Sequence, residues 1–338
     1  MVDIHRFDSR SGLKGEVCNM DFLLSILKNL PDAVSLGLVW GIMAIGVYIT
    51  FKILDIADMT VDGSFALGGC VVASTVAAGW NPWLAGLVAV ACGLAAGAVT
   101  GILHTKLKIP AILAGILTML SLYSINLMIM GGKSNIGMTQ FGENKVDTIF
   151  DGIIAVFRAD GKTVNVVSGI VLAVIIVAGL YWFFGTEKGC MIRATGINEA
   201  MVKAQGGNTD TVKITGIIIA NGFVALSGAL VAQIQRYGDV GMGTGTIVIG
   251  LASIIIGEVI FGTKCSFKVR LASVFFGSII YRVIISVVLL LGFNPNNLKL
   301  LTAVLVIAAL SVPVVRGGIS DRKMIRENLK RYGEAEQC

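Results

Sequence analysis

Residues 54–69 read LDIADMTVDGSFALGG, and three aspartates, Asp55, Asp58 and Asp62, fall within eight residues of this stretch. Long apolar runs flank it, with AVSLGLVWGIMAIGVYITF before it and FALGGCVVASTVAAGW across its end. A carboxylate inside lipid is costly, so acidic residues between two such runs need a reason. The stretch predicts either an interrupted helix in a protein-lined, wet site or a polar loop between two membrane spans.

The composition of the whole chain sets its class. Of the 338 residues, 55% are hydrophobic and 14% are charged, whereas soluble domains carry about a quarter charged residues. Several apolar runs reach about 17–22 residues, enough to cross roughly 30 Å of hydrocarbon as helices. No stretch shows the alternation of a barrel strand. We therefore predict an all-α polytopic membrane protein.

Breakers such as Asn81-Pro82 and Asn294-Pro295-Asn296 divide the apolar sequence into about nine transmembrane helices, within a range of eight to ten. The predicted spans are 33–51, 64–80, 84–105, 110–130, 166–184, 213–233, 247–263, 271–292 and 300–315.

The distribution of Lys and Arg orients the spans. The short loops between them favour a cytoplasmic side that includes residues 185–212 and a basic tail at 316–338, which can hold anionic lipid headgroups. This arrangement puts the C-terminus inside and the N-terminus outside. Residues 1–32 form an N-terminal arm, and Asp21–Leu30 has an apolar face that suits a helix in the membrane interface. A short extension of the first span is the alternative.

A second stretch, YGDVGMGTGTIVIG at Tyr237–Gly250, matches the opening one in outline. Each follows an apolar span, begins with Asp and a β-branched residue, contains Met and Thr near Gly, and enters another span. Five spans separate them, so they face opposite sides of the membrane. We predict two inverted repeats, 33–130 and 213–315, joined by a connector span at 166–184, an arrangement typical of transporters. Chance resemblance of two Gly/Asp loops is the alternative.

The repeats suggest where a solute path lies. Bare backbone is tolerated in a membrane only where protein or water satisfies it, so we expect helix breaks to line the path. Asp62 is expected to cap a helix that restarts near Ser64, and Asp55 and Asp58 fit either this wet site or an ordinary cytoplasmic loop. The residues predicted for the path and the breaks are Asp62, Gly63, Asn221, Gly243 and Thr244.

The polar stretch 185–212 predicts a short helix at 197–206, with Asn198 as its N-cap and Gly206-Gly207-Asn208 as its end. Glu199 and Lys203 form an i,i+4 pair on one side. An apolar stripe lies on the other side and comprises Ile197, Ala200, Met201 and Ala204. Such a stripe packs on its own bundle or docks into a groove on a partner, and the pattern alone leaves both open.

The run GCMIRATGINEAMVKAQGGNTD, followed by ANGFVALSGALVAQIQ, resembles the coupling-loop region of permease subunits of bacterial ABC importers, in the branched-chain amino acid and ribose permease family. KILDIADMTVDGSFALGG and GLASIIIGEVIFG resemble a subgroup linked to tryptophan, tyrosine or related small solutes. The resemblance covers about residues 33–315 and implies a cobalamin-importer-like permease fold. It also implies a permease dimer, two cytoplasmic ATPases, an external solute-binding protein, and docking of helix 197–206 on the ATPase.

Two ionisable residues fall within predicted spans. Glu258 lies near the inner end of span seven and Arg282 near the middle of span eight, at depths that differ by roughly 8 Å. We predict a structural Glu258–Arg282 ion pair that joins the two helices. The alternative is that one of them lines the solute path or serves proton coupling.

The leading hypothesis is therefore a non-catalytic permease subunit in a bacterial inner membrane, which passes a small solute, favoured to be an aromatic amino acid, from an external binding protein to the cytoplasm. We expect no metal, cofactor or nucleic acid, because no nucleophile–base constellation is present and His5 and His104 are isolated. An ion-coupled secondary transporter with inverted repeats is the main alternative, and a membrane scaffold without transport is another.

Overall fold

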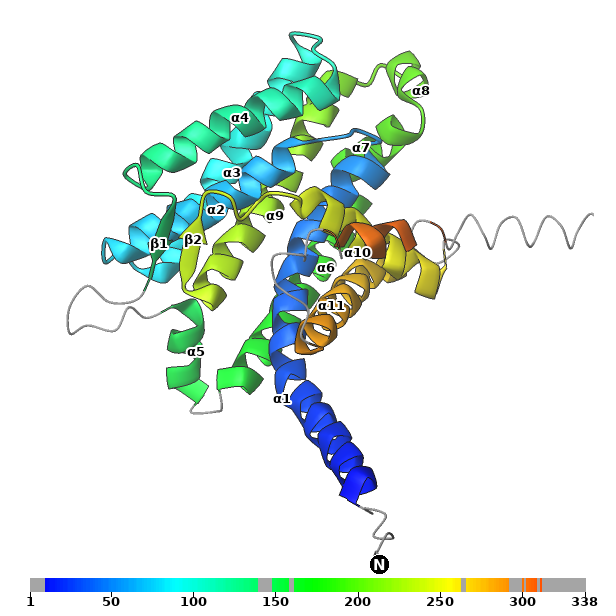
Figure 1. Cartoon of the computed structure of the whole chain (residues 1–338). Coiled ribbons are helices and arrows are strands. Elements are labelled where there is room, and N and C mark those ends of the chain that lie inside the picture. The colour runs from blue at the N-terminus through cyan, green and yellow to red at the C-terminus, as the bar shows by residue number, and fades with distance from the viewer. Residues whose placement is uncertain are drawn as a thin grey trace, which may run out of the picture.

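The computed structural model of the chain describes residues 10–138, 148–157, 161–262, 266–291, 300, 302–308 and 311. Most of them are helical (Figure 1). The long helices are α1 (Arg10–Val47), α2 (Thr60–Ala77), α3 (Pro82–Thr105), α4 (Ala111–Ile129), α6 (Gly161–Gly185), α9 (Thr209–Gln235) and α11 (Phe267–Leu290). Seven helical segments are long and apolar enough to cross a membrane within the described residues, and the apolar helix α10 (Thr246–Phe261) is shorter.

These eight helices correspond to the first eight predicted spans, which confirms a polytopic all-helical membrane fold. The ninth predicted span, 300–315, lies mostly outside the described residues, although residues 302–308 are helical. The segment Asp21–Leu30 is continuous with the first span, because α1 runs through Pro31 without a break. This continuity matches the extension that the sequence left as an alternative to a separate interfacial helix.

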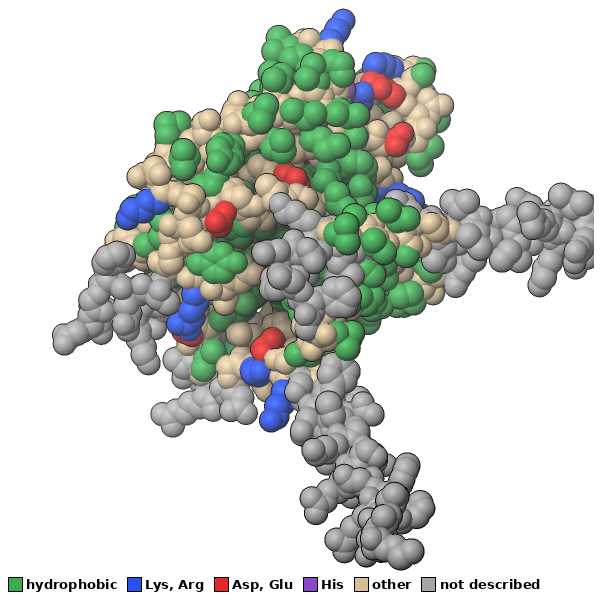
Figure 2. Space-filling model, in the orientation of Figure 1, with side chains coloured by type: hydrophobic (Ala, Val, Ile, Leu, Met, Phe, Trp, Pro, Cys, Tyr) green, Lys and Arg blue, Asp and Glu red, His purple; other side chains and the backbone are tan. Residues whose placement is uncertain are grey.

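The helices divide into an inner and an outer set. In α1, α2 and α9, between 67% and 83% of the most apolar window is buried, against 22–39% in α3, α4, α6 and α11. Figure 2 shows that hydrophobic side chains cover much of the surface between the two ends of the molecule. Exposed apolar helix faces are expected where a chain meets lipid or another membrane subunit.

Small residues allow neighbouring helices to approach closely. A Cβ at Gly68 of α2 would collide with the carbonyl oxygen of Ala225 in α9, and one at Gly228 would collide with the carbonyl oxygen of Phe65. Between α10 and α11, Gly257 and Gly277 play the same role. Close backbone contact of this kind is the usual basis of helix association in membranes.

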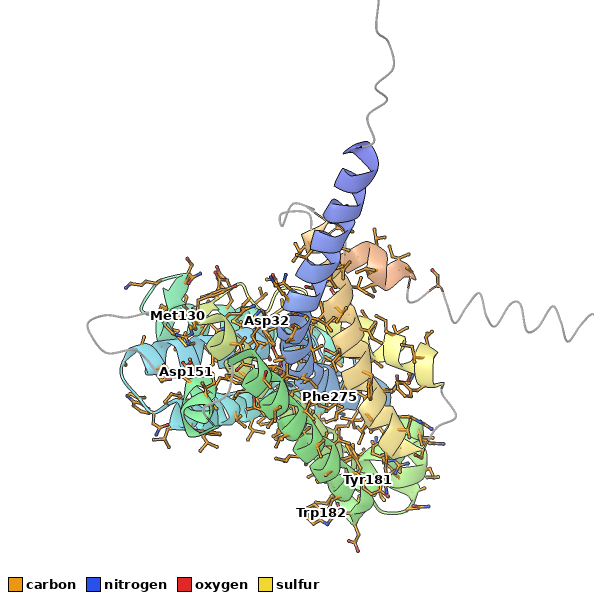
Figure 3. All side chains as sticks on the ribbon, turned by 90° about the horizontal axis from the view of Figure 1, so that it is seen from below. Asp32, Met130, Asp151, Tyr181, Trp182 and Phe275 are labelled. Carbon is orange, nitrogen blue, oxygen red and sulfur yellow. The ribbon has the colours of Figure 1, made fainter. Side chains whose placement is uncertain are left out.

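The two ends of the bundle carry different small elements. At one end, β1 (Asn135–Gly137) pairs antiparallel with β2 (Tyr237–Asp239), and α5 (Ile149–Phe157) contacts α6 and α9. Asp151 of α5 forms an ion pair with Arg236 at 2.8 Å. The opposite end carries α7 (Glu187–Ile197) and α8 (Glu199–Ala204), as Figure 1 shows. Figure 3 shows Trp182 at the end of α6 that leads into α7.

Candidate functional site

The stretch 54–59 is a non-helical break between two helices. α1 ends in a π-helical turn, Tyr48–Ile53, and α2 starts at Thr60. Asp58 is buried and caps α2, since its Oδ1 accepts a hydrogen bond from the Thr60 backbone N–H at 2.9 Å. Asp55 is exposed, in a left-handed conformation with φ 55°. The sequence left two roles open for both Asp55 and Asp58. In the structure, Asp58 is buried at the helix break and Asp55 lies on the surface.

Asn221 of α9 fastens this break from the other side. Its Nδ2 donates to Asp58 Oδ2 at 2.8 Å, and its Oδ1 accepts from the Ser64 hydroxyl at 2.7 Å. It is fully buried. Asn221 was predicted to face the solute path, whereas in the structure it is buried inside the helix bundle, where its amide joins α9 to the start of α2.

Asp62 caps a helix, but a different one from the helix expected. Its Oδ2 accepts from the Gly245 backbone N–H at 2.9 Å. Its Oδ1 accepts from the Thr246 hydroxyl at 2.8 Å and from the Ile247 backbone N–H at 3.0 Å. Asp62 sits in the first turn of α2 and closes the N-terminus of α10, so one carboxylate lies near the positive ends of two helix dipoles.

The remaining predicted break residues lie around this carboxylate. Gly243 packs against the Asp62 carbonyl oxygen so closely that a Cβ would collide with it. Gly63 faces α4, where a Cβ would lie 3.0 Å from the Leu122 side chain. Thr244 is exposed and lines a cavity. The two stretches that the sequence compared, near residues 54–69 and 237–250, thus meet in space through Asp62 and Gly243.

The predicted Glu258–Arg282 ion pair is corrected by the structure. The Glu258 carboxylate lies 3.0 Å from Lys52 Nζ, and the Arg282 guanidinium lies 3.8 Å from the centre of the Trp40 ring. Lys52 lies in the π-helical turn that follows α1, at the same end of the bundle as the end of α10, so it reaches Glu258 without crossing the apolar interior. Arg282 lies further along α11 and finds an aromatic face instead.

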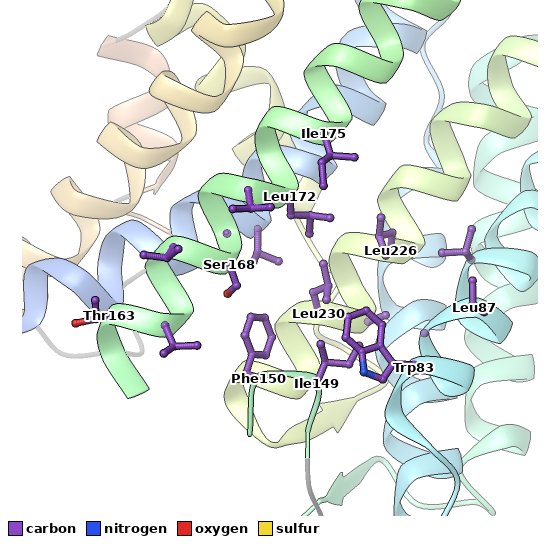
Figure 4. Close-up of a pocket in the computed structure, with 18 residues that line it drawn as sticks. Trp83, Leu87, Ile149, Phe150, Thr163, Ser168, Leu172, Ile175, Leu226 and Leu230 are labelled. Carbon is purple, nitrogen blue, oxygen red and sulfur yellow. The ribbon is translucent and has the colours of Figure 1, made fainter. Parts of the chain in front are cut away.

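Two cavities differ in chemistry. One, of about 640 Å³, lies between α3, α5, α6 and α9, and Figure 4 shows its lining, in which Thr163 and Ser168 stand among apolar residues such as Trp83 and Leu230. It holds no charged side chain and fits apolar material only. The other, of about 510 Å³, contains Arg282 and Thr244 and lies beside the start of α10. The second therefore has groups that recognise a polar solute, which the first lacks.

The predicted short helix at 197–206 is shorter, α8 (Glu199–Ala204), and begins as expected, because Asn198 Oδ1 accepts from the Met201 backbone N–H at 3.0 Å. Val202 is the residue that packs inward, at 5% exposure. The predicted apolar stripe faces out: Ile197 is 86% exposed, Met201 is 46% exposed, and Ala200 and Ala204 are exposed as well. The stripe therefore does not pack on the part of the bundle that the structure describes.

Glu199 holds α8 in place. Its carboxylate pairs with Lys203 at 3.0 Å and with Lys213 of α9 at 2.7 Å, and it accepts from the Thr209 hydroxyl at 3.1 Å. The hydrogen bond from Lys213, followed by that from Lys203, lowers the pKa of Glu199 to about 2. α8 is thus anchored through its charged side, while its apolar side stays open.

Sequence reasoning missed three of these contacts. Lys213 follows Glu199 by fourteen residues across a turn, a spacing that no helical periodicity covers. The Lys52–Glu258 pair had a usable signal, because Lys52 directly follows the predicted span 33–51 and Glu258 lies near the inner end of span seven. The third is a chain of hydroxyls in which Thr60, Thr100 and Thr118 join α2, α3 and α4; a lone threonine in an apolar run gives no such signal.

Comparison with known proteins finds similarity to permease components of transport systems. A family model described as "Branched-chain amino acid transport system / permease component" matches residues 29–310. The "Tyrosine transport system permease protein" of Clostridioides difficile (strain R20291) is 41% identical over 84% of this chain and 91% of its own length. An uncharacterized protein of Rickettsia prowazekii (strain Madrid E) is 30% identical over 83% of this chain and 96% of its own.

A more distant relative carries a different printed substrate. The "Ribose import permease protein RbsC" of Escherichia coli (strain K12) is 28% identical over 83% of this chain and 79% of its own. No solved structure matched the chain.

Proposed function

The chain belongs to the family of permease components of branched-chain amino acid transport systems, and from this premise we propose that it is the translocation subunit of an ATP-driven importer. Permease subunits of ABC-type systems perform no chemistry themselves. ATP is hydrolysed on separate cytoplasmic ATPase chains, and the solute arrives from an external binding protein. The functional unit is a dimer of permease chains, in a bacterial inner membrane with the C-terminus in the cytoplasm.

One observation carries the proposal: an apolar stripe, formed by the last residue of α7 together with α8, is not covered by the described residues of the bundle. Ile197 and Met201 are the large members of this stripe. A short amphipathic helix fits a groove on a partner through spaced apolar anchors, and Glu199 fastens α8 to α9, which reaches the Asp58 break through Asn221. Closure of an ATPase on this stripe would therefore move α9 and, with it, the contact between the two repeats.

The solute is proposed to be an amino acid, with aromatic side chains favoured. This finer point rests on the 41% identical relative, whose printed name specifies tyrosine transport. The sugar transport named for the 28% identical relative is a weaker guide because the similarity is lower.

The test is co-purification and uptake with the neighbouring subunits. Full-length permease is purified with its ATPase chain, and the double variant Glu199→Arg/Met201→Asp is expected to lose that chain. The matched control is Thr211→Asp, an exposed position at the same end of the molecule. Retention of the ATPase by the double variant would contradict docking at α8.

Energy coupling is tested in proteoliposomes. Uptake that needs internal ATP and survives an uncoupler supports the importer. Uptake that collapses with an uncoupler while ATP persists supports the ion-coupled alternative instead.

A further inference from the structure

The cavity of about 510 Å³ beside α10 contains polar side chains, and its lining comes from five helices, α1, α2, α9, α10 and α11, together with the helical residues 302 and 303. Its lining includes Trp40 of α1, Phe65 of α2, Gln235 of α9, and Tyr281 and Arg282 of α11. Thr244 and Gly245, at the helix break that Asp62 caps, form its edge. The cavity therefore lies where the two compared stretches meet.

Arg282 gives this cavity one positive charge. The residue lies inside a membrane-length helix, and no carboxylate of the described residues forms an ion pair with it. Its guanidinium lies 3.8 Å from the centre of the Trp40 ring, and the Phe65 ring lies 4.9 Å from Trp40. Stacking on an aromatic face offsets part of the cost of a buried charge. An ionisable residue without a counter-ion inside a membrane bundle indicates a functional site.

Three residues that line this cavity carry polar atoms without partners in the described residues. Arg282 Nε, Trp40 Nε1 and the Tyr281 hydroxyl are buried and lack hydrogen-bond partners in the described part of the chain. Trp40 is 7% exposed and Tyr281 is 1% exposed. Buried polar atoms are almost always paired, so three unpaired ones on residues that line one cavity point to a ligand.

We propose that this cavity binds a small solute through its carboxylate, with Arg282 as the anchor and the rings of Trp40 and Phe65 against an aromatic or branched apolar body. A guanidinium matches a carboxylate through two parallel N–H donors. The Trp40 indole N–H adds a donor, whereas the Tyr281 hydroxyl and the Gln235 amide oxygen can accept from an ammonium group. The volume falls in the range of small-molecule sites.

The inference rests on the proposed function and deepens it, since it names the residues that would hold the carboxylate and the apolar body of an amino acid. An anionic lipid headgroup would satisfy the same guanidinium, so the test must separate the two sources.

The first experiment uses the native full-length chain. Binding of radiolabelled L-tyrosine, L-phenylalanine and L-leucine is measured in nanodiscs of phosphatidylcholine, with 3-(4-hydroxyphenyl)propionate, tyramine and D-ribose as competitors. We expect at least one amino acid to bind, the propionate to compete, and tyramine to compete at least tenfold more weakly. Equal competition by tyramine or ribose, or no binding by all three amino acids, would overturn the proposal. Loss of binding in nanodiscs that contain phosphatidylglycerol would assign the site to lipid and overturn it too.

The second experiment uses variants. Arg282→Met is expected to weaken amino-acid binding at least tenfold while the thermal midpoint stays equal or rises, because a buried unpaired charge is removed. Arg282→Lys should retain part of the binding, and Lys133→Met, an exposed position, should behave as native. Native-like binding by Arg282→Met would refute the anchor. A lowered midpoint would show that Arg282 is structural, and the competitor series on the native chain then decides.

The two proposals fail separately. ATP-driven uptake that is unchanged by Arg282→Met leaves the importer intact and removes the binding site. Carboxylate-dependent binding without any ATP-driven uptake keeps the site and removes the importer.

Discussion

The helix break around Asp62 and the α8 end of the molecule differ in whether their interacting groups have partners within the chain. At the break, each Asp62 carboxylate oxygen and the amide of Asn221 find partners within the chain. At α8, charged groups are paired by Glu199, but the apolar stripe has no partner in the described residues. Contacts within the chain stabilise the first region, whereas the second region has an apolar surface that suits contact with a partner. Substitutions should therefore affect folding at the break and association at α8.

The largest effect on folding is expected at Asp62. Asp62→Asn keeps the shape but replaces one acceptor oxygen by an NH₂ group that would face N–H donors at the start of α10. Loss of charge-assisted bonds to a buried helix end should cost about 3 kcal/mol, measured as a lowered thermal midpoint in detergent. Asp55→Asn is the matched control, because Asp55 is exposed and asparagine tolerates its positive φ. Equal midpoints for the two variants would remove the capping role.

A smaller loss is expected at Asn221. Asn221→Ala leaves Asp58 without one donor and the Ser64 hydroxyl without its acceptor, which should cost about 2 kcal/mol. Asn126 of α4 is the control: it is equally buried, yet both its amide atoms lack partners in the described residues. Asn126→Leu should therefore leave the midpoint unchanged or raise it. A larger loss at Asn126 than at Asn221 would show that burial, not bonding, sets these costs.

The part of the fold that depends on local pattern could be predicted. Eight of the nine span predictions matched helices, because a long apolar run between breakers has few alternatives in a membrane. The Asn198 cap was also predictable, since the interaction joins residues three apart. The inverted repeats stay a prediction, to which the meeting of Asp62 with Gly243 adds support.

The part that depends on contacts between distant helices could not be predicted. Asp62 was expected to cap its own helix, but the donors it binds lie more than 180 residues away. Glu258 and Arg282 were paired on depth alone, although depth does not fix which faces of two helices meet. The apolar stripe at 197–204 was visible in the sequence pattern, but the pattern did not show which way it faces. The structure shows that it faces outward.

The smallest effect is expected at Glu199, whose pKa of about 2 lies below the ordinary value of 4.5. A carboxyl whose pKa is lowered in the folded state stabilises the fold at any pH above its ordinary pKa of 4.5. This stabilisation is lost as the pH falls from 4.5 towards 2. The side chain is 35% exposed, so water and salt weaken its pairs with Lys203 and Lys213. A spin label at Gln205 should thus keep constant mobility from pH 7 to pH 5 and gain mobility only below about pH 4.5. Glu199→Gln should show the loosened state at every pH, and a native chain that loosens between pH 7 and pH 5 would place the anchor of α8 elsewhere.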